Sequence, residues 1–178
     1  YVTVSQAQAL SEKLVPDKGT TSSLMFGIQW DLVMKYLETK GVSESELKTN
    51  SDSWGNYRDV EFQVRQGNKY AIYNNFILGE WNDIPENYTK PIFDTDGYGV
   101  LLTTGATERN SKMNIYDLAG NEWEWTLEKS TTDSYYTCAI RGGVYYGLGP
   151  GSPASFRGND GTSSSSNLLG FRPSLYVK

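Results

Sequence analysis

Asn114-Ile-Tyr-Asp-Leu-Ala-Gly-Asn-Glu-Trp-Glu-Trp-Thr126 is the stretch of the chain that decides the fold. Oxygen donors recur through it around Gly120, which lets the backbone turn sharply. Calcium binds six to eight oxygens from carboxylates and carbonyls. The stretch therefore predicts a calcium site made by the side chains of Asp117 and Glu124 and the main-chain oxygens of Gly120 and Glu122. A second interpretation stays open, in which Glu124 caps a turn and the two tryptophans fill the core.

Two short motifs follow this stretch, Arg141-Gly-Gly143 and Gly170-Phe-Arg-Pro173. In this order, the three motifs resemble the formylglycine-generating-enzyme or sulfatase-modifying-factor domain. The resemblance implies a C-type-lectin-type fold. It also implies calcium at Asp117, Gly120, Glu122 and Glu124, because the matching positions ligate calcium in family members.

The catalytic cysteines of that family are missing from this chain. The resemblance places them near Gly147 and Ser152, where paired thiolates bind the copper that activates oxygen. The single cysteine is Cys138, which precedes Arg141 and is expected to be a small core residue rather than a nucleophile. The chain also has no histidine and so lacks the usual general base and transition-metal ligand. We therefore expect no copper and no enzyme activity.

The segment Val144 to Leu169 has an unusual composition. It contains no Lys, Glu, Gln, Met or Trp and is rich in Tyr, Ser, Gly and Asn, an alphabet that paratopes favour. Every residue type in it can be reached from an Asn codon by changing the first two bases. This pattern resembles the variable proteins of diversity-generating retroelements, which also use the C-type-lectin fold. In that interpretation the residues of Arg141-Gly-Gly143 and Gly170-Phe-Arg172 are scaffold.

The positions between these anchors are expected to form a ligand-binding face. The predicted binding residues are Tyr145, Tyr146, Leu148, Ser152, Phe156, Asn159 and Asp160. A flexible surface loop rich in Gly and Ser is the alternative, although Phe156 would be costly to expose without purpose. Arg157 is equally compatible with a buried role, bound to backbone carbonyls.

Charge and hydropathy exclude several partner classes. The net charge of -5 and the absence of dense Lys or Arg runs argue against nucleic acid. The longest apolar runs fall far short of the roughly 18 residues that a membrane span requires. We expect a single domain over residues 1–178, the C-terminal domain of a longer protein, located on an extracellular surface or a phage virion. Asn87-Tyr-Thr89 matches a glycosylation sequon by pattern alone.

Local patterns predict an α+β chain with two N-terminal helices followed by short antiparallel strands and many loops. The first helix is expected over Ser5 to Leu14, and the second from Ser22 to a stop at Thr39-Lys-Gly41. Leu24, Ile28, Leu32, Val33, Tyr36 and Leu37 supply its apolar periodicity. Ser43 to Leu47 fits one further helical turn or a loop. Strands or ordered loops are expected at 59–64, 70–77 and 99–103, with a closing strand at 172–177.

The leading functional hypothesis is a non-enzymatic domain that binds an unknown protein or glycan. A divergent formylglycine-generating-type oxidase is one alternative. A purely structural domain of a surface or phage-tail protein is the other.

Overall fold

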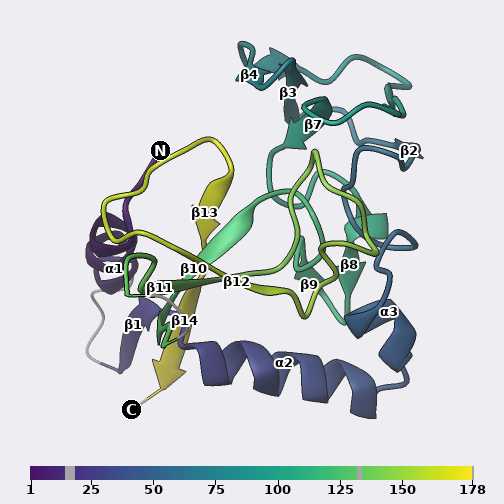
Figure 1. Ribbon diagram of the computed structural model, residues 1–178. Helices are drawn as coiled ribbons and strands as arrows, with labels where there is room; N and C mark the ends of the chain where they lie inside the picture. The colour runs from purple at the N-terminus through teal and green to yellow at the C-terminus, as the bar shows by residue number, and fades with distance from the viewer. Residues whose placement is uncertain (15–18, 132–133, 178) are drawn as a thin grey trace. The chain divides into compact units, whose positions relative to one another are not determined.

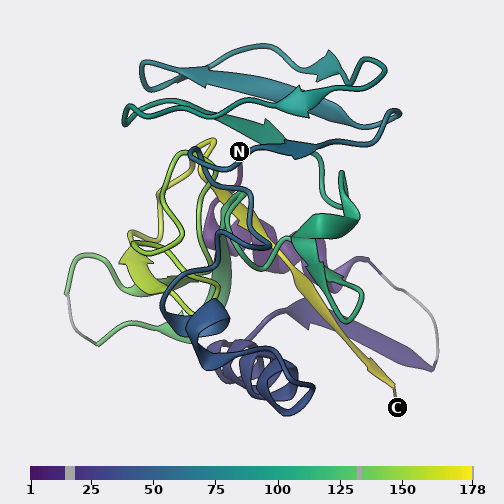
Figure 2. The same cartoon turned by 90° about the vertical axis from the view of Figure 1, so that its right-hand side faces the viewer.

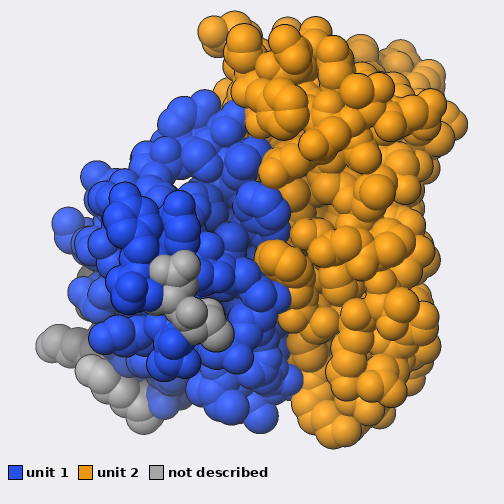
Figure 3. All heavy atoms as spheres, viewed as in Figure 1, with its two compact units in different colours: residues 1–33, 123–141, 157–178 blue, residues 34–122, 142–156 orange. Residues whose placement is uncertain are grey.

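The computed structural model describes residues 1–14, 19–131 and 134–177. It is an α+β protein with few helices and many short strands, which confirms the predicted class (Figure 1). Its contacts divide the chain into two compact units that alternate along the sequence (Figure 3). Unit 1 comprises Tyr1–Val33, Trp123–Arg141 and Arg157–Lys178, and unit 2 comprises Met34–Glu122 and Gly142–Phe156. The prediction of a single domain over residues 1–178 stays a prediction.

Unit 1 combines helix α1 with two sheets. Thr3 caps α1 (Val4–Glu12) through a capping box with Gln6, so the first predicted helix is confirmed with slightly earlier ends. Its strands are β1 (Thr20–Leu24), β10 (Trp123–Lys129), β11 (Cys138–Arg141), β12 (Arg157–Asp160), β13 (Leu169–Phe171) and β14 (Pro173–Val177). Strand β1 pairs with β14, which confirms the predicted closing strand. The other four form a sheet in the order β12-β11-β10-β13.

The core of unit 1 lies between α1 and these strands. Trp125 is fully buried there, and its indole N–H donates to the carbonyl of Val2 at 3.1 Å. The other buried members are Val4, Ala7, Leu24, Ile140 and Leu169. Burying such a large indole contributes several kcal/mol at roughly 25 cal/mol per Å². The motif of the opening stretch thus supplies a central core residue.

Helix α2 (Gly27–Thr39) corrects the second predicted helix in two ways. It begins at Gly27, because residues 20–24 instead form β1, whose backbone pairs with β14. Its predicted apolar stripe is also wrong, since Ile28 and Leu32 are 67% and 61% exposed. Leu37 is buried as predicted, but Trp30 and Met34 are buried in place of Ile28 and Leu32, which hides the larger indole. The predicted stop is right: Gly41 has φ +92, which favours glycine.

Unit 2 holds the remaining elements. They are α3 (Glu44–Lys48), β2 (Phe62–Gln63), β3 (Lys69–Asn74), β4 (Ile77–Leu78), β5 (Asn82–Asp83), β6 (Thr89–Lys90), β7 (Gly99–Leu102), the 3₁₀ turn η1 (Glu108–Asn110), β8 (Ser111–Lys112) and β9 (Ile115–Tyr116). A capping box between Ser43 and Glu46 starts α3, so of the two alternatives for Ser43 to Leu47 the helical turn is present and the loop is not. Strand β3 pairs with β7 along one edge and with β4 and β5 along the other, in the teal part of the chain in Figure 2. Of the two alternatives left open, this sheet shows strand at 99–102 and over most of 70–77, where a turn at 75–76 separates β3 from β4, whereas only two residues of 59–64 are strand.

A second hydrophobic core belongs to unit 2. Val100 and Leu102 of β7 are buried in it, together with Phe62, Val64, Ile84 and Ala106. Half-buried Tyr70 and Ile72 of β3 pack against this cluster from the neighbouring strand. Each unit therefore has its own buried cluster among the described residues.

Candidate functional site

The opening stretch forms a hairpin, a tight turn and the start of a strand. Strands β8 and β9 pair with Ser111 opposite Tyr116, and Met113 and Asn114 take positive φ in the turn between them. Beyond the hairpin, Asp117, Gly120 and Asn121 also have positive φ. A Cβ at Gly120 would lie 2.2 Å from the carbonyl oxygen of Asn56, so only glycine fits there. The sharp turn predicted at Gly120 is present.

Asn121 has a structural role that the sequence did not indicate. Its side-chain amide both donates to the carbonyl of Leu102 and accepts from the N–H of Leu102, each at 3.1 Å. The same oxygen accepts from Asn56 Nδ2 at 2.9 Å, and Asn56 Nδ2 also donates to the carbonyl of Val100. The two asparagines thus act as extra backbone partners for β7. Isolated Asn residues in loops give no sequence signal for such a role.

The four predicted calcium ligands are divided between the units. Asp117, Gly120 and Glu122 lie in unit 2, where Asp117 is buried and accepts a hydrogen bond from the N–H of Gly105 at 2.8 Å. Glu124 lies in unit 1 and is paired with Arg172, whose Nε and Nη2 donate to its two oxygens at 2.7 and 2.5 Å. Within residues 1–14, 19–131 and 134–177, no group of three or more His, Cys, Asp or Glu side chains is arranged to hold a metal ion. Calcium binding stays a prediction, and it would require Arg172 to share or release Glu124.

The two arginines of the motifs expected to be scaffold are held by ion pairs within unit 1. Arg141 is 3% exposed and forms an ion pair with Asp31 of α2. Arg172, besides holding Glu124, lies over the ring of Trp30 at 5.8 Å. A desolvated bidentate pair of this kind is costly to break from one side. These contacts hold two arginines of unit 1, one preceding and one following the segment 144–169.

Residues 142–156 of unit 2 form an irregular loop, which we call the anchored loop. The structure assigns it no helix or strand, yet its backbone is bound at several points. The N–H of Gly149 donates to Asp52 Oδ1 and the N–H of Ala154 donates to Ser51 Oγ, each at 2.9 Å. Tyr57 Oη donates to the carbonyl of Ser152 at 2.7 Å. The loop is held in one path by side chains far away in sequence.

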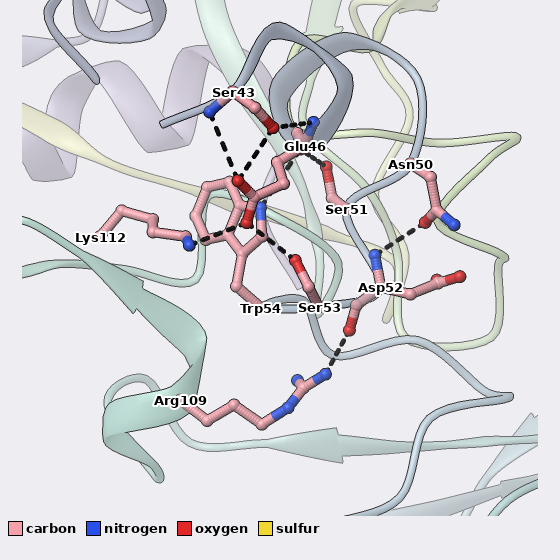
Figure 4. A network of polar contacts seen from close by, with 9 residues as sticks. All are labelled: Ser43, Glu46, Asn50, Ser51, Asp52, Ser53, Trp54, Arg109 and Lys112. Atoms are coloured by element: carbon pink, nitrogen blue, oxygen red, sulfur yellow. Dashed lines mark hydrogen bonds and ion pairs between the residues drawn. The ribbon is translucent and has the colours of Figure 1, made fainter. Parts of the chain in front are cut away.

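The residues that hold the anchored loop are themselves connected. Figure 4 shows this network around α3, with Asn50 accepting from the N–H of Asp52 and Ser51 Oγ donating to the carbonyl of Glu46. Glu46 accepts from Lys112 at 3.0 Å and from Ser43 at 2.9 Å. The ammonium of Lys112, followed by the Ser43 hydroxyl, lowers the pKa of Glu46 to about 2. Arg109 donates to the carbonyl of Asp52. Residues 51 and 52, which hold the anchored loop, are therefore themselves bound to α3 and to Arg109.

The structure corrects part of the predicted binding face in unit 2. Tyr145 is 0% exposed and Ser152 is 6% exposed, so neither is available to contact a ligand. Tyr145 packs edge-on to Tyr73 at 5.2 Å, because β7 offers a close approach at Gly99. Leu148 remains exposed, and Tyr146 and Phe156 are half-buried. Burial raises the pKa of Tyr146, so its hydroxyl stays neutral.

The other two predicted binding residues lie in unit 1, on strand β12. Asn159 donates to the carbonyl of Tyr136 at 3.2 Å, and Asp160 accepts from Ser164 Oγ at 2.6 Å. Asn159 also lines a small pocket of about 170 Å³ together with Ser130, Thr131, Arg157 and Gly158. Arg157 is exposed and pairs with Glu128, so it is not the buried residue that the sequence allowed.

Cys138 lies on β11 and packs against the core of unit 1. Burial raises its pKa, which keeps the thiol protonated and a poor nucleophile. It lines a pocket of about 370 Å³ with Thr126, Leu127 and Glu128 of β10 and with Val4 and Gln8 of α1. Its position fits the expected role of a small, partly buried core residue.

Lys90 is the most unusual titratable residue, and the sequence gave no sign of it. Its side chain is 0% exposed, and Nζ donates to the carbonyls of Tyr57 and Val60 at 2.7 Å and of Pro91 at 3.2 Å. Burial lowers its pKa to about 7. The three carbonyls belong to residues outside helices and strands, and one of these residues, Tyr57, also holds the anchored loop. Lys90 therefore satisfies acceptors that a regular strand would have paired.

Comparison with known protein families gives a match over most of the chain. The family model described as the sulfatase-modifying factor enzyme 1-like domain matches residues 17–174. Searches of curated proteins and of solved structures gave no significant match. None of the helices in the described part of the chain has the length and apolar character of a membrane span.

Proposed function

We propose, from the premise that this chain belongs to the sulfatase-modifying factor enzyme 1-like domain family, that it is a non-enzymatic ligand-binding domain. In this proposal the family's scaffold, with a C-type-lectin-type topology, is kept. Exposed side chains of the residues that lie in sequence between Arg141-Gly-Gly143 and Gly170-Phe-Arg172 bind an unknown protein or glycan. Tyr146, Leu148 and Phe156 form the proposed face of unit 2, and Asn159 and Asp160 form that of unit 1, each described by itself.

The anchored loop is the observation that carries the proposal. Backbone hydrogen bonds to Ser51, Asp52 and Tyr57 fix its path, while the side chain of Leu148 is exposed and that of Tyr146 is half-buried. A loop fixed before binding loses little entropy on binding, which favours affinity. Loops held by a rigid scaffold are a common location for binding residues. A flexible surface loop would not need these contacts.

We further propose that residues 144–169 are diversified, as in the variable proteins of diversity-generating retroelements. The composition of the segment supports this, because all of its residue types are reachable from an Asn codon. The buried positions, such as Tyr145 and Ser152, would then be kept for folding, while exposed positions vary. The neighbouring DNA tests this directly. A near-copy of the C-terminal coding segment beside a reverse transcriptase gene is expected, and identical copies of 144–169 across one genome would instead favour a purely structural domain.

The binding proposal is tested with arrays of immobilised oligosaccharides and of bacterial surface proteins. The labelled chain is expected to bind particular spots, and the double variant Tyr146→Ala, Leu148→Ala to lose at least about tenfold in affinity. Tyr36→Ala, at an exposed position of α2, is the matched control and should bind as the wild type does. Equal binding by the wild type and the double variant would contradict the proposed face.

The absence of enzyme activity is a separate part of the proposal. The chain has one cysteine, whereas the family's copper chemistry uses two, and burial keeps that thiol protonated. Incubation with copper, oxygen and a cysteine-containing peptide should leave the peptide unchanged by mass spectrometry. Conversion of the cysteine to formylglycine would show instead that the chain is a divergent oxidase.

We keep structural calcium as a proposal for the set Asp117, Gly120, Glu122 and Glu124. Because Arg172 occupies both oxygens of Glu124, binding should be weak. Calcium is expected to raise the unfolding temperature relative to EDTA, and Asp117→Asn to remove that difference. An unfolding temperature that does not respond to calcium would exclude the site. An extracellular or phage-surface location, where free calcium is abundant, fits the same proposal.

A further inference from the structure

The hairpin made by β3 and β4 in unit 2 exposes large apolar side chains. Phe76 is 59% exposed and Ile77 is 70% exposed at its tip. Trp81 is 45% exposed on the segment that joins β4 to β5. Strands β4 and β5 both pair with β3 along the edge opposite to β7; Ile77 belongs to β4, and Trp81 directly precedes β5. We call Phe76, Ile77 and Trp81 the hairpin surface.

The tip of the hairpin is held in place. The N–H of Phe76 donates to the carbonyl of Gly97 at 3.0 Å. A Cβ on Gly97 would lie 2.6 Å from the Phe76 ring, so the ring rests directly on this glycine. Tyr73 contacts Phe76 edge-on at 6.3 Å. Phe76 therefore keeps its exposed position through defined contacts and also takes φ +64, which glycine would adopt more easily.

The exposed charged side chains of the segment that carries the hairpin surface are acidic. Within residues 74–96, all of which the structure describes, Glu80, Asp83, Glu86, Asp94 and Asp96 are exposed. The single basic residue of this range is Lys90, which is 0% exposed. Lys69 and Arg58 each reach one of these acids, Asp83 and Asp96, from outside the range. The apolar side chains thus stand in an acidic setting.

We propose that the hairpin surface docks a partner protein through a segment whose apolar side chains are flanked by Lys or Arg. Exposed apolar side chains in a polar surround mark interaction sites, and the acidic setting selects a basic partner. A second copy of this chain would bring the same carboxylates together, which disfavours self-pairing. An anionic membrane would be repelled in the same way. The hairpin surface lies outside residues 144–169. The docking proposal can therefore be tested separately from the proposed ligand-binding face.

The test uses the whole chain and two labelled amphipathic helical peptides, one of Leu and Lys and one in which every Lys is Glu. Fluorescence polarisation should show the Leu/Lys peptide binding at least about tenfold more tightly, with an affinity that falls as salt rises. The double variant Phe76→Gly, Ile77→Thr should lose at least about tenfold in affinity. Its fold should persist, since glycine suits the turn and threonine suits a strand. Asp94→Asn with Asp96→Asn should bind more weakly and with a smaller salt dependence.

The matched control is Ile28→Gln with Leu32→Gln, which removes apolar side chains of similar exposure from α2. It should leave peptide affinity unchanged. Equal binding of the two peptides, or equal losses in the hairpin and α2 variants, would overturn the proposal. Two further results would also overturn it. One is binding to vesicles of anionic lipid that Phe76→Gly, Ile77→Thr abolishes, and the other is dimerisation in sedimentation that the same variant abolishes.

Discussion

The two units hold the two parts of the segment 144–169 by different means. In unit 1, β12 pairs with β11 from Cys138 opposite Asp160 to Arg141 opposite Arg157. In unit 2, the anchored loop has no strand and depends on hydrogen bonds to Ser51, Asp52 and Tyr57. The backbone N–H and carbonyl groups of a paired strand bond to the neighbouring strand whatever its side chains are. The backbone of the anchored loop instead needs the side chains of Ser51, Asp52 and Tyr57 as partners. Changes of side chain should therefore be tolerated better along β12 than at the residues that hold the anchored loop.

Gly143→Ala should have the largest effect and would break the loop's attachment. A Cβ there would lie 2.4 Å from the carbonyl oxygen of Ser152 and 2.8 Å from the backbone nitrogen of Gly120, and backbone atoms cannot move aside easily. We expect a loss of about 3 kcal/mol or more in the free energy of unfolding, measured by urea denaturation. Gly151→Ala is the control in the same loop, because its nearest contact would be at 3.8 Å. Equal stabilities of the two variants would refute the proposed close approach.

Lys90 should make the stability of unit 2 depend on pH. Burial lowers its folded pKa to about 7, below the unfolded value of 10.5, so the unfolded state binds more protons between these values. The free energy of unfolding should therefore rise with pH above 7, by at most about 1.4 kcal/mol per unit. Urea denaturation from pH 7 to 8 measures this slope below the range where tyrosine titrates, and the lysine substitutions described next separate it from the cysteine, whose free thiol titrates at about pH 8.5.

The control for this slope is a pair of substitutions at two lysines. Lys90→Met should flatten the slope, whatever it does to the stability at pH 7. Lys69→Met, at a half-exposed surface lysine, should leave the slope as it is. A slope that persists in Lys90→Met would assign the pH dependence to another group.

Tyr57→Phe should have a smaller effect, because it removes one hydroxyl and leaves the ring in place. The hydroxyl donates to the carbonyl of Ser152, and Tyr57 is 0% exposed. Leaving that carbonyl unpaired should cost about 1–3 kcal/mol. Hydrogen exchange should show faster exchange of the amides of residues 147–155. Tyr36→Phe at the surface of α2 should change neither quantity, and protection of the loop that survives Tyr57→Phe would show that this anchor is dispensable.

Asn159→Ala should have the smallest effect on stability and would sharpen the comparison. Its side chain makes a 3.2 Å bond to the carbonyl of Tyr136, while its backbone is already paired in β12. We expect a change of about 0.5 kcal/mol or less in thermal unfolding. A loss as large as that of Tyr57→Phe would mean that the two units do not differ in the way described.

Features of the fold that depend on local chemistry were predictable from the sequence. The capping box of Ser43 with Glu46 and the stop at Gly41 involve residues close together in the chain, so they leave a local pattern. Strand β1 leaves none, because Thr20-Thr-Ser-Ser-Leu24 has no alternation and takes its structure from β14. The exposed face of α2 was also missed, since a periodic pattern does not say which of two apolar stripes the rest of the chain covers.

The candidate site shows the same limit on a smaller scale. The glycine and arginine motifs locate the loop, yet they do not distinguish Tyr145 from Tyr146. These neighbours carry the same side chain and both rings lie close to Tyr73, but only Tyr145 lies against Gly99 and is fully buried. Asn56, Asn121 and Lys90 were missed for a related reason. Their roles come from carbonyls that irregular backbone leaves unpaired, and these partners are identifiable only in three dimensions.

The alternation of the two units along the chain has a consequence for inheritance. The chain passes from one unit to the other after Val33, Glu122, Arg141 and Phe156. A single crossover between two related genes will therefore usually give each unit segments from both parents. After such a crossover, segments that come from different parents must pack against one another inside each unit. Substitution at single codons avoids that conflict, because it leaves the other segments of each unit as they were.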